Sequence, residues 1–322
     1  MRFAAVLLSG MLMATPTFAQ QASSTTTSLP INLQRPSLDI NWSIEETRSA
    51  SIPAEIVADT RALARNGLPD GRVDTTEERG DIEEAWYSEP TRRYRHGVLG
   101  DAIEAAALKV RTFRGETYTF RLPSTEVFED ITPRIADLDG DGTNEVISIL
   151  SSRQDGASVA VFGLVGNAFV KKAQSKFIGR SNRWLNIAGI DHFASRRAKQ
   201  IAIVETPHLA GVFKLLFIST TSSQLLSNTR VPGFSNHQIG SRELRLSAVG
   251  NLDNDGLADL VLPSLDRRLL YIISPTRRGV KLLSRIELPA RVNRAIALKG
   301  EGDSLELTVG LDDGKRYVVK QQ

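Results

Sequence analysis

The sequence predicts an all-β fold, and three observations support this prediction. Short apolar runs such as EVISIL, QIAIVE and DLVLPS are separated by clusters of Gly, Asn, Asp and Ser, which is typical of strands joined by turns. From about Tyr94 onward no helix-length periodic segment interrupts these runs, which argues against alternating strands and helices. In addition, one acidic turn occurs twice, each time followed by an apolar run.

The first residues have the pattern of a secretory signal peptide. Met1–Arg2 gives a short basic start, Phe3–Met13 is apolar, and Thr17–Ala19 supplies small residues at the cleavage positions. We therefore expect residues 1–19 to be removed after export. An uncleaved anchor would need about 20 apolar residues, and Pro16 with the polar residues beyond it argues against one.

The signal peptide predicts export. We expect a periplasmic or secreted, cell-surface location, with no transmembrane span after removal of the signal peptide. The chain has no cysteine, so disulfides are excluded. Any cross-link that stabilises the fold must be non-covalent or formed by a metal ion. The 40 basic and 37 acidic residues nearly balance and form no long basic run, so we expect no nucleic-acid partner.

The segment before the apolar runs has a different amino-acid composition. Residues 20–50 are rich in Ser, Thr, Gln and Pro, which predicts a flexible leader. Residues 51–93 are expected to be a helical or irregular N-terminal extension. Within it, SIPAEIVADTRALARNG has the capping and spacing of an amphipathic helix that ends at Gly67, and GDIEEAWY is expected to form a second short helical turn.

Repeats indicate which kind of all-β domain occupies the rest of the chain. IADLDGDGTNEVISIL, from Ile135, corresponds position by position to VGNLDNDGLADLVLPS, from Val249. Three degenerate copies fit the same pattern, starting at Ile187, His96 and Ile296. Five candidate units of roughly 40–60 residues have the length of propeller blades. Residues 94–322 are therefore expected to form a β-propeller of about five blades.

The acidic turns have the ligand spacing of a calcium loop. Ca²⁺ takes six to eight oxygen ligands, and side chains at alternate positions of a tight loop can converge on one ion. The first turn offers Asp137, Asp139, Asp141, the Thr143 carbonyl and Glu145. The second turn offers Asn251, Asp253, Asp255, the Leu257 carbonyl and Asp259. We expect a structural Ca²⁺ in each turn, and the charge count predicts weaker binding in the second. The alternative is a solvated acidic turn without an ion.

An EF-hand begins with the same D-x-D-x-D-G pattern but does not fit the spacing. It needs a bidentate Glu at loop position 12 and flanking helices. Position 12 is Ser148 in the first turn and Leu262 in the second, and both fall in expected strands.

The pattern D-x-D-x-D-G-x-x-D/E between two strands resembles the FG-GAP/VCBS repeats, found in the propeller of integrin α-chains and in exported bacterial proteins. This resemblance implies a propeller scaffold and calcium bound by the ten residues named above. The departures are Glu145 where the family usually has Asp, Asn251 at the start of the second turn, and ligand-free remaining units. Members differ in activity, so the resemblance implies no reaction.

Two function classes are compatible with the sequence. The first is a non-enzymatic binding or scaffold protein whose ligand is an unidentified protein or carbohydrate of the envelope or cell surface. The second is a propeller enzyme that acts on carbohydrate or another envelope polymer. The segment WYSEPTRRYRHG (Trp86–Gly97) either packs its rings on the first blade or recognises an acidic or sugar ligand. The four histidines show no metal-ligand spacing.

Overall fold

The computed structural model describes residues 33, 35–38, 40–49, 51–54, 67–74, 80–300 and 304–322, and within 67–74 only the Leu68 side chain. The predicted all-β class is confirmed, because the described residues form antiparallel strands and no α-helix. No helix among them is long and apolar enough to cross a membrane. The predicted signal peptide, most of the predicted leader and the centre of the predicted helix (55–66) lie outside the described residues.

One sheet of nine strands contains the N-terminal half of the described chain. Its strand order is β10-β9-β8-β6-β4-β3-β2, with β5 paired to β4 and β7 paired to β8. The strands are β2 (Gly67–Asp74), β3 (Ile82–Thr91), β4 (Glu104–Thr112), β5 (Thr117–Arg121), β6 (Glu126–Phe128), β7 (Arg134–Ala136), β8 (Glu145–Ser152), β9 (Gly156–Val165) and β10 (Ala168–Gln174).

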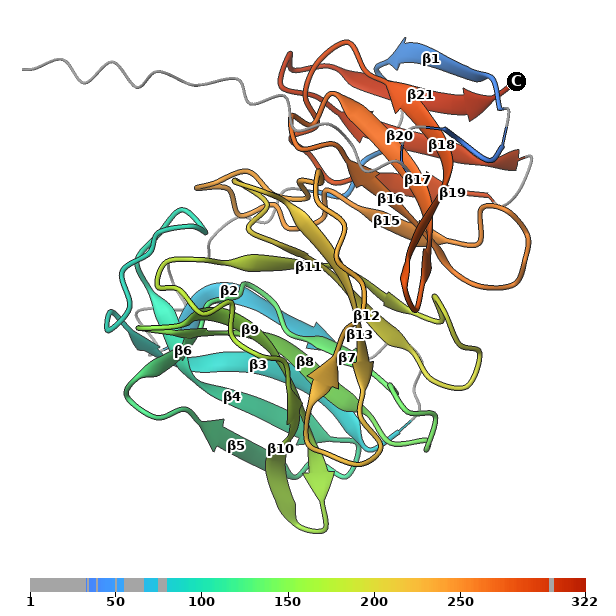
Figure 1. Ribbon diagram of the computed structural model, residues 1–322. Coiled ribbons are helices and arrows are strands. Elements are labelled where there is room, and N and C mark those ends of the chain that lie inside the picture. The colour runs from blue at the N-terminus through green and yellow to red at the C-terminus, as the bar shows by residue number, and fades with distance from the viewer. Residues whose placement is uncertain are drawn as a thin grey trace, which may run out of the picture.

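Three four-stranded antiparallel sheets contain the remaining strands. The first contains β11 (Leu185–Asp191), β12 (Gln200–Glu205), β13 (Val212–Ile218) and β14 (Leu225–Leu226). The second contains β15 (Ala248–Gly250), β16 (Asp259–Pro263), β17 (Leu269–Thr276) and β18 (Gly279–Glu287). The third contains β19 (Ala297–Lys299), β20 (Glu306–Gly310) and β21 (Arg316–Gln321), and β1 (Trp42–Thr47) completes it beside β21. Figure 1 shows β1, in blue, lying next to the red C-terminal strand.

Separate apolar cores join the sheets. On β8, Ile147 and Ile149 belong to a core shared with β11 and β12 of the next sheet, whereas Val146 and Leu150 belong to a core within the nine-stranded sheet, shared with β3 and β4. Further cores join the β11–β14 sheet to the β15–β18 sheet, and that sheet to the β19–β21 sheet. Strands buried on both faces read as nearly continuous apolar runs, which explains sequences such as EVISIL.

Four of the predicted copies begin at a short strand. The copies that start at Ile135, Ile187 and Val249 coincide with β7, β11 and β15, each the first of four consecutive strands. The copy that starts at Ile296 coincides with β19, which forms a four-stranded sheet with β20, β21 and the N-terminal β1. The copy that starts at His96 differs, because residues 92–103 before β4 contain no strand. Ser148 lies in β8 and Leu262 lies in β16, so neither acidic turn has the position-12 ligand of an EF-hand.

Three expectations for the N-terminal region need correction. Residues 42–47 of the predicted flexible leader form β1, because Trp42 and Ile44 pack against the core of the last two sheets. GDIEEAWY is strand and not helix: it enters β3, where Ile82, Ala85 and Tyr87 are buried. The expected boundary at residues 93/94 falls between β3 and β4, which pair over most of their length.

Candidate metal centre

The two acidic turns occupy the same place in their units. The first joins β7 to β8, and the second joins β15 to β16. Glu145 and Asp259, the last predicted side-chain ligands, are also the first residues of β8 and β16. Both are fully buried, so each turn ends on a carboxylate fixed by a strand.

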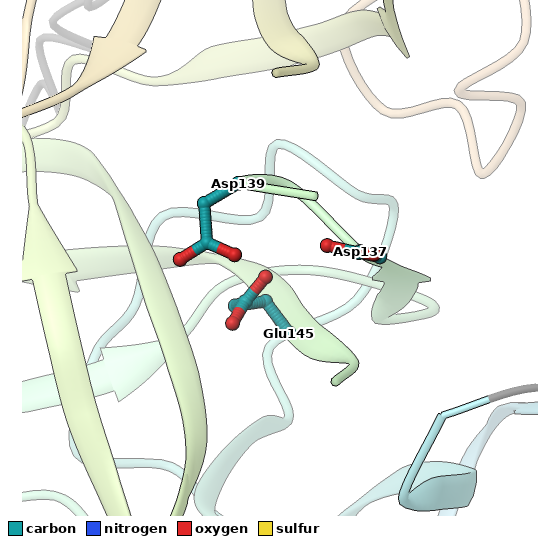
Figure 2. Close-up of side chains that lie close together, drawn as sticks. All are labelled: Asp137, Asp139 and Glu145. Carbon is teal, nitrogen blue, oxygen red and sulfur yellow. The ribbon is translucent and has the colours of Figure 1, made fainter. Parts of the chain in front are cut away.

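The first turn brings three carboxylates together. Single ligand oxygens from Asp137, Asp139 and Glu145 all lie within 4.8 Å of one another. In Figure 2, Asp139 and Glu145 point toward each other and Asp137 lies at the side of the same turn. Carboxylate oxygens at this separation suit a hard divalent cation, so this group could hold a metal ion.

Asp141 and Thr143, also predicted as ligands, are bonded mainly to each other. Asp141 is exposed, and its Oδ1 accepts hydrogen bonds from the N–H and the hydroxyl of Thr143 at 2.7 and 2.6 Å. These bonds lower the pKa of Asp141. The structure therefore leaves Asp141 outside the three convergent carboxylates.

A lysine that the sequence did not point to enters the first turn. Lys172, on β10, places Nζ 2.5 Å from Glu145 Oε1 and 3.9 Å from Asp139 Oδ2. Burial raises the pKa of Glu145, and Lys172 opposes that rise. Burial alone would lower the pKa of Lys172, but Glu145 raises it overall. The turn thus already contains one positive charge.

The second turn repeats the backbone bonding of the first. Leu138 N–H donates to Glu145 Oε2 at 2.9 Å, and Leu252 N–H donates to Asp259 Oδ2 at 2.8 Å. The aspartates at the next position also match, because the Asp139 and Asp253 carboxylates each accept a hydrogen bond from the backbone N–H two residues later, at 3.2 Å. Leu257 N–H donates to Asp255 Oδ1 at 2.8 Å, as Thr143 does to Asp141. The two turns are therefore copies in structure as well as in sequence.

Two buried oxygens of the second turn accept no hydrogen bond. They are Asn251 Oδ1 and Asp259 Oδ1. Burial, together with the charge of Asp253, raises the pKa of Asp259 to about 6, although N–H donors to Oδ2 and the nearby Ser274 hydroxyl oppose the rise. Leaving buried acceptors unpaired is costly, and a cation is a partner that would satisfy both oxygens. Lys281 Nζ is 3.9 Å from Asp253 Oδ2 and half exposed.

The loop between β11 and β12 lies between the two acidic turns. Lys199 N–H donates to the Leu138 carbonyl at 2.8 Å, and Ala258 N–H donates to the His192 carbonyl at 3.0 Å. Gly140 has φ +80°, and a Cβ there would lie 2.8 Å from the Arg197 carbonyl oxygen. The turn thus needs glycine both for its backbone and for this close approach.

This middle loop belongs to the predicted degenerate copy that starts at Ile187, and it contains three basic residues, Arg196, Arg197 and Lys199. Arg196 Nη2 donates to the Asp255 carbonyl at 2.5 Å. On the other side of the first turn, Asp81 Oδ1 accepts from Asn144 N–H at 2.8 Å. Sequence reasoning missed Lys172, Arg196 and Asp81, because each belongs to a segment far from the turn that it contacts.

A separate cluster of titratable groups surrounds Trp184. His237 Nε2 donates to the Ser241 carbonyl at 2.9 Å, so His237 Nδ1 is the acceptor in its 2.8 Å hydrogen bond with His208 Nε2. The Trp184 ring lies 4.7 Å from the His237 ring and 6.3 Å from the His208 ring, centroid to centroid. Burial lowers the pKa of His208 to about 4 and that of His237 to about 3. Both imidazoles are therefore neutral near pH 7.

No protein-family model matches the chain, and no curated protein matches it. We therefore infer the function from the geometry of the two turns.

Proposed function

We propose that the protein binds Ca²⁺ at both acidic turns and uses the ions to fix the ends of neighbouring sheets. The observation that carries this proposal is the convergence of Asp137, Asp139 and Glu145. The unpaired Asn251 Oδ1 and Asp259 Oδ1 support it independently at the second turn. Calcium accepts carboxylate, amide and backbone oxygens in a flexible shell, which is the donor set that both turns offer.

The two turns differ in whether a bound ion must displace a positively charged side chain from the last carboxylate. At the first turn the ion displaces the Lys172 ammonium from Glu145. At the second turn no cation of the described residues pairs with the matching carboxylate of Asp259, because Arg196 bonds the Asp255 carbonyl and Lys281 lies 3.9 Å from Asp253 Oδ2. Lys172 offsets the extra carboxylate of the first turn. We therefore propose that the second turn binds Ca²⁺ at least as tightly as the first, which reverses the ranking that the charge count alone predicts.

The scaffold in this proposal is a propeller of FG-GAP/VCBS-like repeats. Its support is the series of four-stranded units that pack face to face, with the N-terminal strand β1 completing the last one. The β7–β10 strands and the three four-stranded sheets supply four blades, and β2–β5 supply the material for a fifth. In such folds an N-terminal strand beside the C-terminal one protects the edges of the terminal sheet.

As a function we propose a non-enzymatic binding or scaffold protein of the cell envelope, exported through the predicted signal peptide. Its partner would be a protein or carbohydrate of the envelope or cell surface. Each proposed ion lies in a turn that joins two strands and is held by a carboxylate fixed at a strand end, so we propose that the ions are structural.

Calorimetric titration of the calcium-free protein with CaCl₂ tests the metal proposal. We expect two sites with dissociation constants of about 10⁻⁴–10⁻³ M or tighter, one lost in Asp137→Asn and the other in Asp259→Asn. Asp155→Asn, which removes a carboxylate from the exposed turn at the far end of β8, should keep both sites. Absence of binding in the wild-type protein would refute the proposal.

A second candidate function, an enzyme acting on carbohydrate or another envelope polymer, draws on the His208–His237 pair. Two imidazoles with strongly lowered pKa values beside an indole ring resemble the perturbed groups that gather at active sites. Release of reducing ends from envelope polysaccharide, abolished by His208→Asn, would favour this candidate. No release by the wild-type protein would leave the binding function as the better account, and unchanged release in the variant would exclude His208 from the activity.

A further inference from the structure

A cavity of about 450 Å³ that is widely open to solvent lies at the other end of β8, remote from the first acidic turn. Glu145 begins β8 and Arg153 lies just beyond its last residue, so a strand of about 25 Å separates the two features. Three segments form the walls: Arg92–Arg95 after β3, Arg153 in the β8–β9 turn, and Ser181–Asn182 before β11.

The charged side chains that line this cavity are all positive. Four of its lining residues are arginines and none is acidic: Arg92, Arg93, Arg95 and Arg153. Among the described residues, no carboxylate lies within 4.0 Å of the guanidinium groups of Arg92, Arg95 or Arg153. Guanidinium groups repel one another when they face a single volume. An anion between them would turn this repulsion into attraction.

Arg93 fixes the first wall without losing its charge. Its Nε donates to the Glu126 carbonyl at 2.8 Å, and its Nη2 donates to the Pro123 carbonyl at 3.0 Å. Both acceptors are neutral backbone oxygens. These bonds hold the Arg92–Arg95 segment in place. The Glu126 and Glu89 carboxylates interact with the charge of Arg93, so the exposed Arg92, Arg95 and Arg153 supply the charge that faces the cavity.

The other walls are also held by backbone hydrogen bonds. Gly179 N–H and Arg180 N–H both donate to the Asp155 carbonyl, at 2.8 and 3.1 Å, and Ala157 N–H donates to the Arg183 carbonyl at 2.8 Å. Asn182, between these anchors, has a φ of +53°. Such conformations are uncommon for residues other than glycine and gather at ligand sites. The cavity is thus formed before any ligand enters.

Tyr94 also lines the cavity. The residue is 4% exposed, and its hydroxyl lies inside the protein near the Ser151 hydroxyl and the Asn182 backbone. Its burial fixes the segment that carries the neighbouring arginines. Ser181 and Asn182 supply further polar groups that could hold hydroxyls of a ligand.

We propose that this cavity binds an oxyanion: the carboxylate, sulfate or phosphate group of a small ligand or of a terminal acidic sugar. Guanidinium groups match such anions with paired N–H donors. The volume falls in the range of about 300–1,000 Å³ that is usual for small-molecule sites. The site would give the protein a ligand of defined chemistry, and its distance from the acidic turns makes the two proposals independent.

Calorimetric titration with sodium sulfate, inorganic phosphate and sodium glucuronate at constant ionic strength tests the assignment, with glucose as the neutral control. We expect saturable binding of at least one anion and none of glucose, with and without a calcium chelator. Preference for glucuronate would identify a carboxylate-bearing sugar, and preference for sulfate or phosphate would identify a tetrahedral anion.

Variants separate the cavity from general positive charge. Arg95→Ala and Arg153→Ala should each weaken anion binding by about tenfold or more, and Arg153→Lys should weaken it less. Both arginines are exposed and form no side-chain hydrogen bonds within the described residues, so the variants should keep the wild-type melting temperature. Arg278→Ala removes an exposed charge from the β17–β18 turn and should bind as the wild type does. Absence of anion binding, or equal weakening in Arg278→Ala, would overturn the proposal.

Discussion

Lys172 Nζ lies 2.5 Å from Glu145 Oε1, so an ammonium group from β10 stands among the carboxylates of the first acidic turn. Glu145 is fully buried and Lys172 is partly buried. Charges this close interact strongly, because water screens them poorly away from the surface. The lysine therefore stabilises the turn without an ion and competes with any ion that binds there.

Replacing Lys172 with methionine should raise the Ca²⁺ affinity of the first turn by about tenfold or more, because a competing positive charge is removed. Without calcium the same variant should be less stable than the wild type, because Glu145 is left buried and unpaired. Calorimetry and thermal unfolding measure both effects. Lys171→Met removes the neighbouring lysine, which bonds to Gln174 instead, and should change neither quantity. Unaltered calcium binding in Lys172→Met would show that the lysine does not occupy the ion's position.

Asn251→Asp should tighten calcium binding at the second turn by about tenfold, since a fourth carboxylate replaces an amide at a buried position. In chelator the variant should melt below the wild type, because the new charge is desolvated with no partner. The gain in melting temperature on adding calcium should therefore be larger than in the wild type. Asn254→Asp places the same charge on an exposed residue of the same turn and provides the matched control. Equal gains in the two variants would count against Asn251 as a ligand.

Stability should fall as the pH drops below 6.5, through His208 and His237. Their folded pKa values of about 4 and 3 lie below the ordinary 6.5, so the unfolded chain binds protons that the folded protein does not. The contribution of the two neutral histidines to the free energy of unfolding is fully present above pH 6.5. It is lost as the pH falls toward 3–4, at about 1.4 kcal/mol per histidine for each pH unit.

Urea unfolding at pH 7 and pH 5 measures this loss, and His237→Asn should reduce the difference between the two values. His192→Gln, in the β11–β12 loop and bonded to the Ser195 carbonyl, should leave the difference as in the wild type. A pH dependence that is identical in His237→Asn would contradict the assignment.

Ile44→Asn should destabilise the protein by about 1–3 kcal/mol, because the partly buried Ile44 of β1 packs against the core of the last two sheets and an amide loses this apolar contact. Glu45→Gln, at the neighbouring exposed position on the same strand, should change stability by less than about 0.5 kcal/mol. Chemical denaturation of both variants gives the comparison. Equal stability would mean that β1 is not part of the cooperative fold.

Local pattern was enough to predict the strands and the acidic turns. The apolar runs EVISIL and DLVLPS lie in β8 and β16 because both faces of these strands are buried. The repeated turn was recognisable because its chemistry is local: each aspartate caps backbone N–H groups within a few residues. The convergence of Asp137, Asp139 and Glu145 follows from that short spacing.

Long-range pairing explains what the sequence did not indicate. Residues 42–47 look too polar to order themselves, yet β1 gains its stability from β21, which lies at the opposite end of the chain. GDIEEAWY favours a helix by composition, but β3 pairs with β4, and Arg111 Nε bonds Glu84 Oε2 at 2.7 Å across that pair. Lys172 pairs with Glu145 from a different strand, β10. His208 is hydrogen-bonded to His237, which lies far from it in the sequence. No spacing rule predicts such contacts.

A crystal structure of the protein soaked in calcium shows whether both acidic turns bind the ion. We expect an ion in each turn, about 2.3–2.6 Å from its oxygen ligands. In the first turn these include Asp137, Asp139 and Glu145, and Lys172 has moved away from Glu145. In the second turn they include Asn251 Oδ1 and Asp259 Oδ1. Turns that hold only water at saturating calcium, with Lys172 still bonded to Glu145, would contradict the proposed calcium sites.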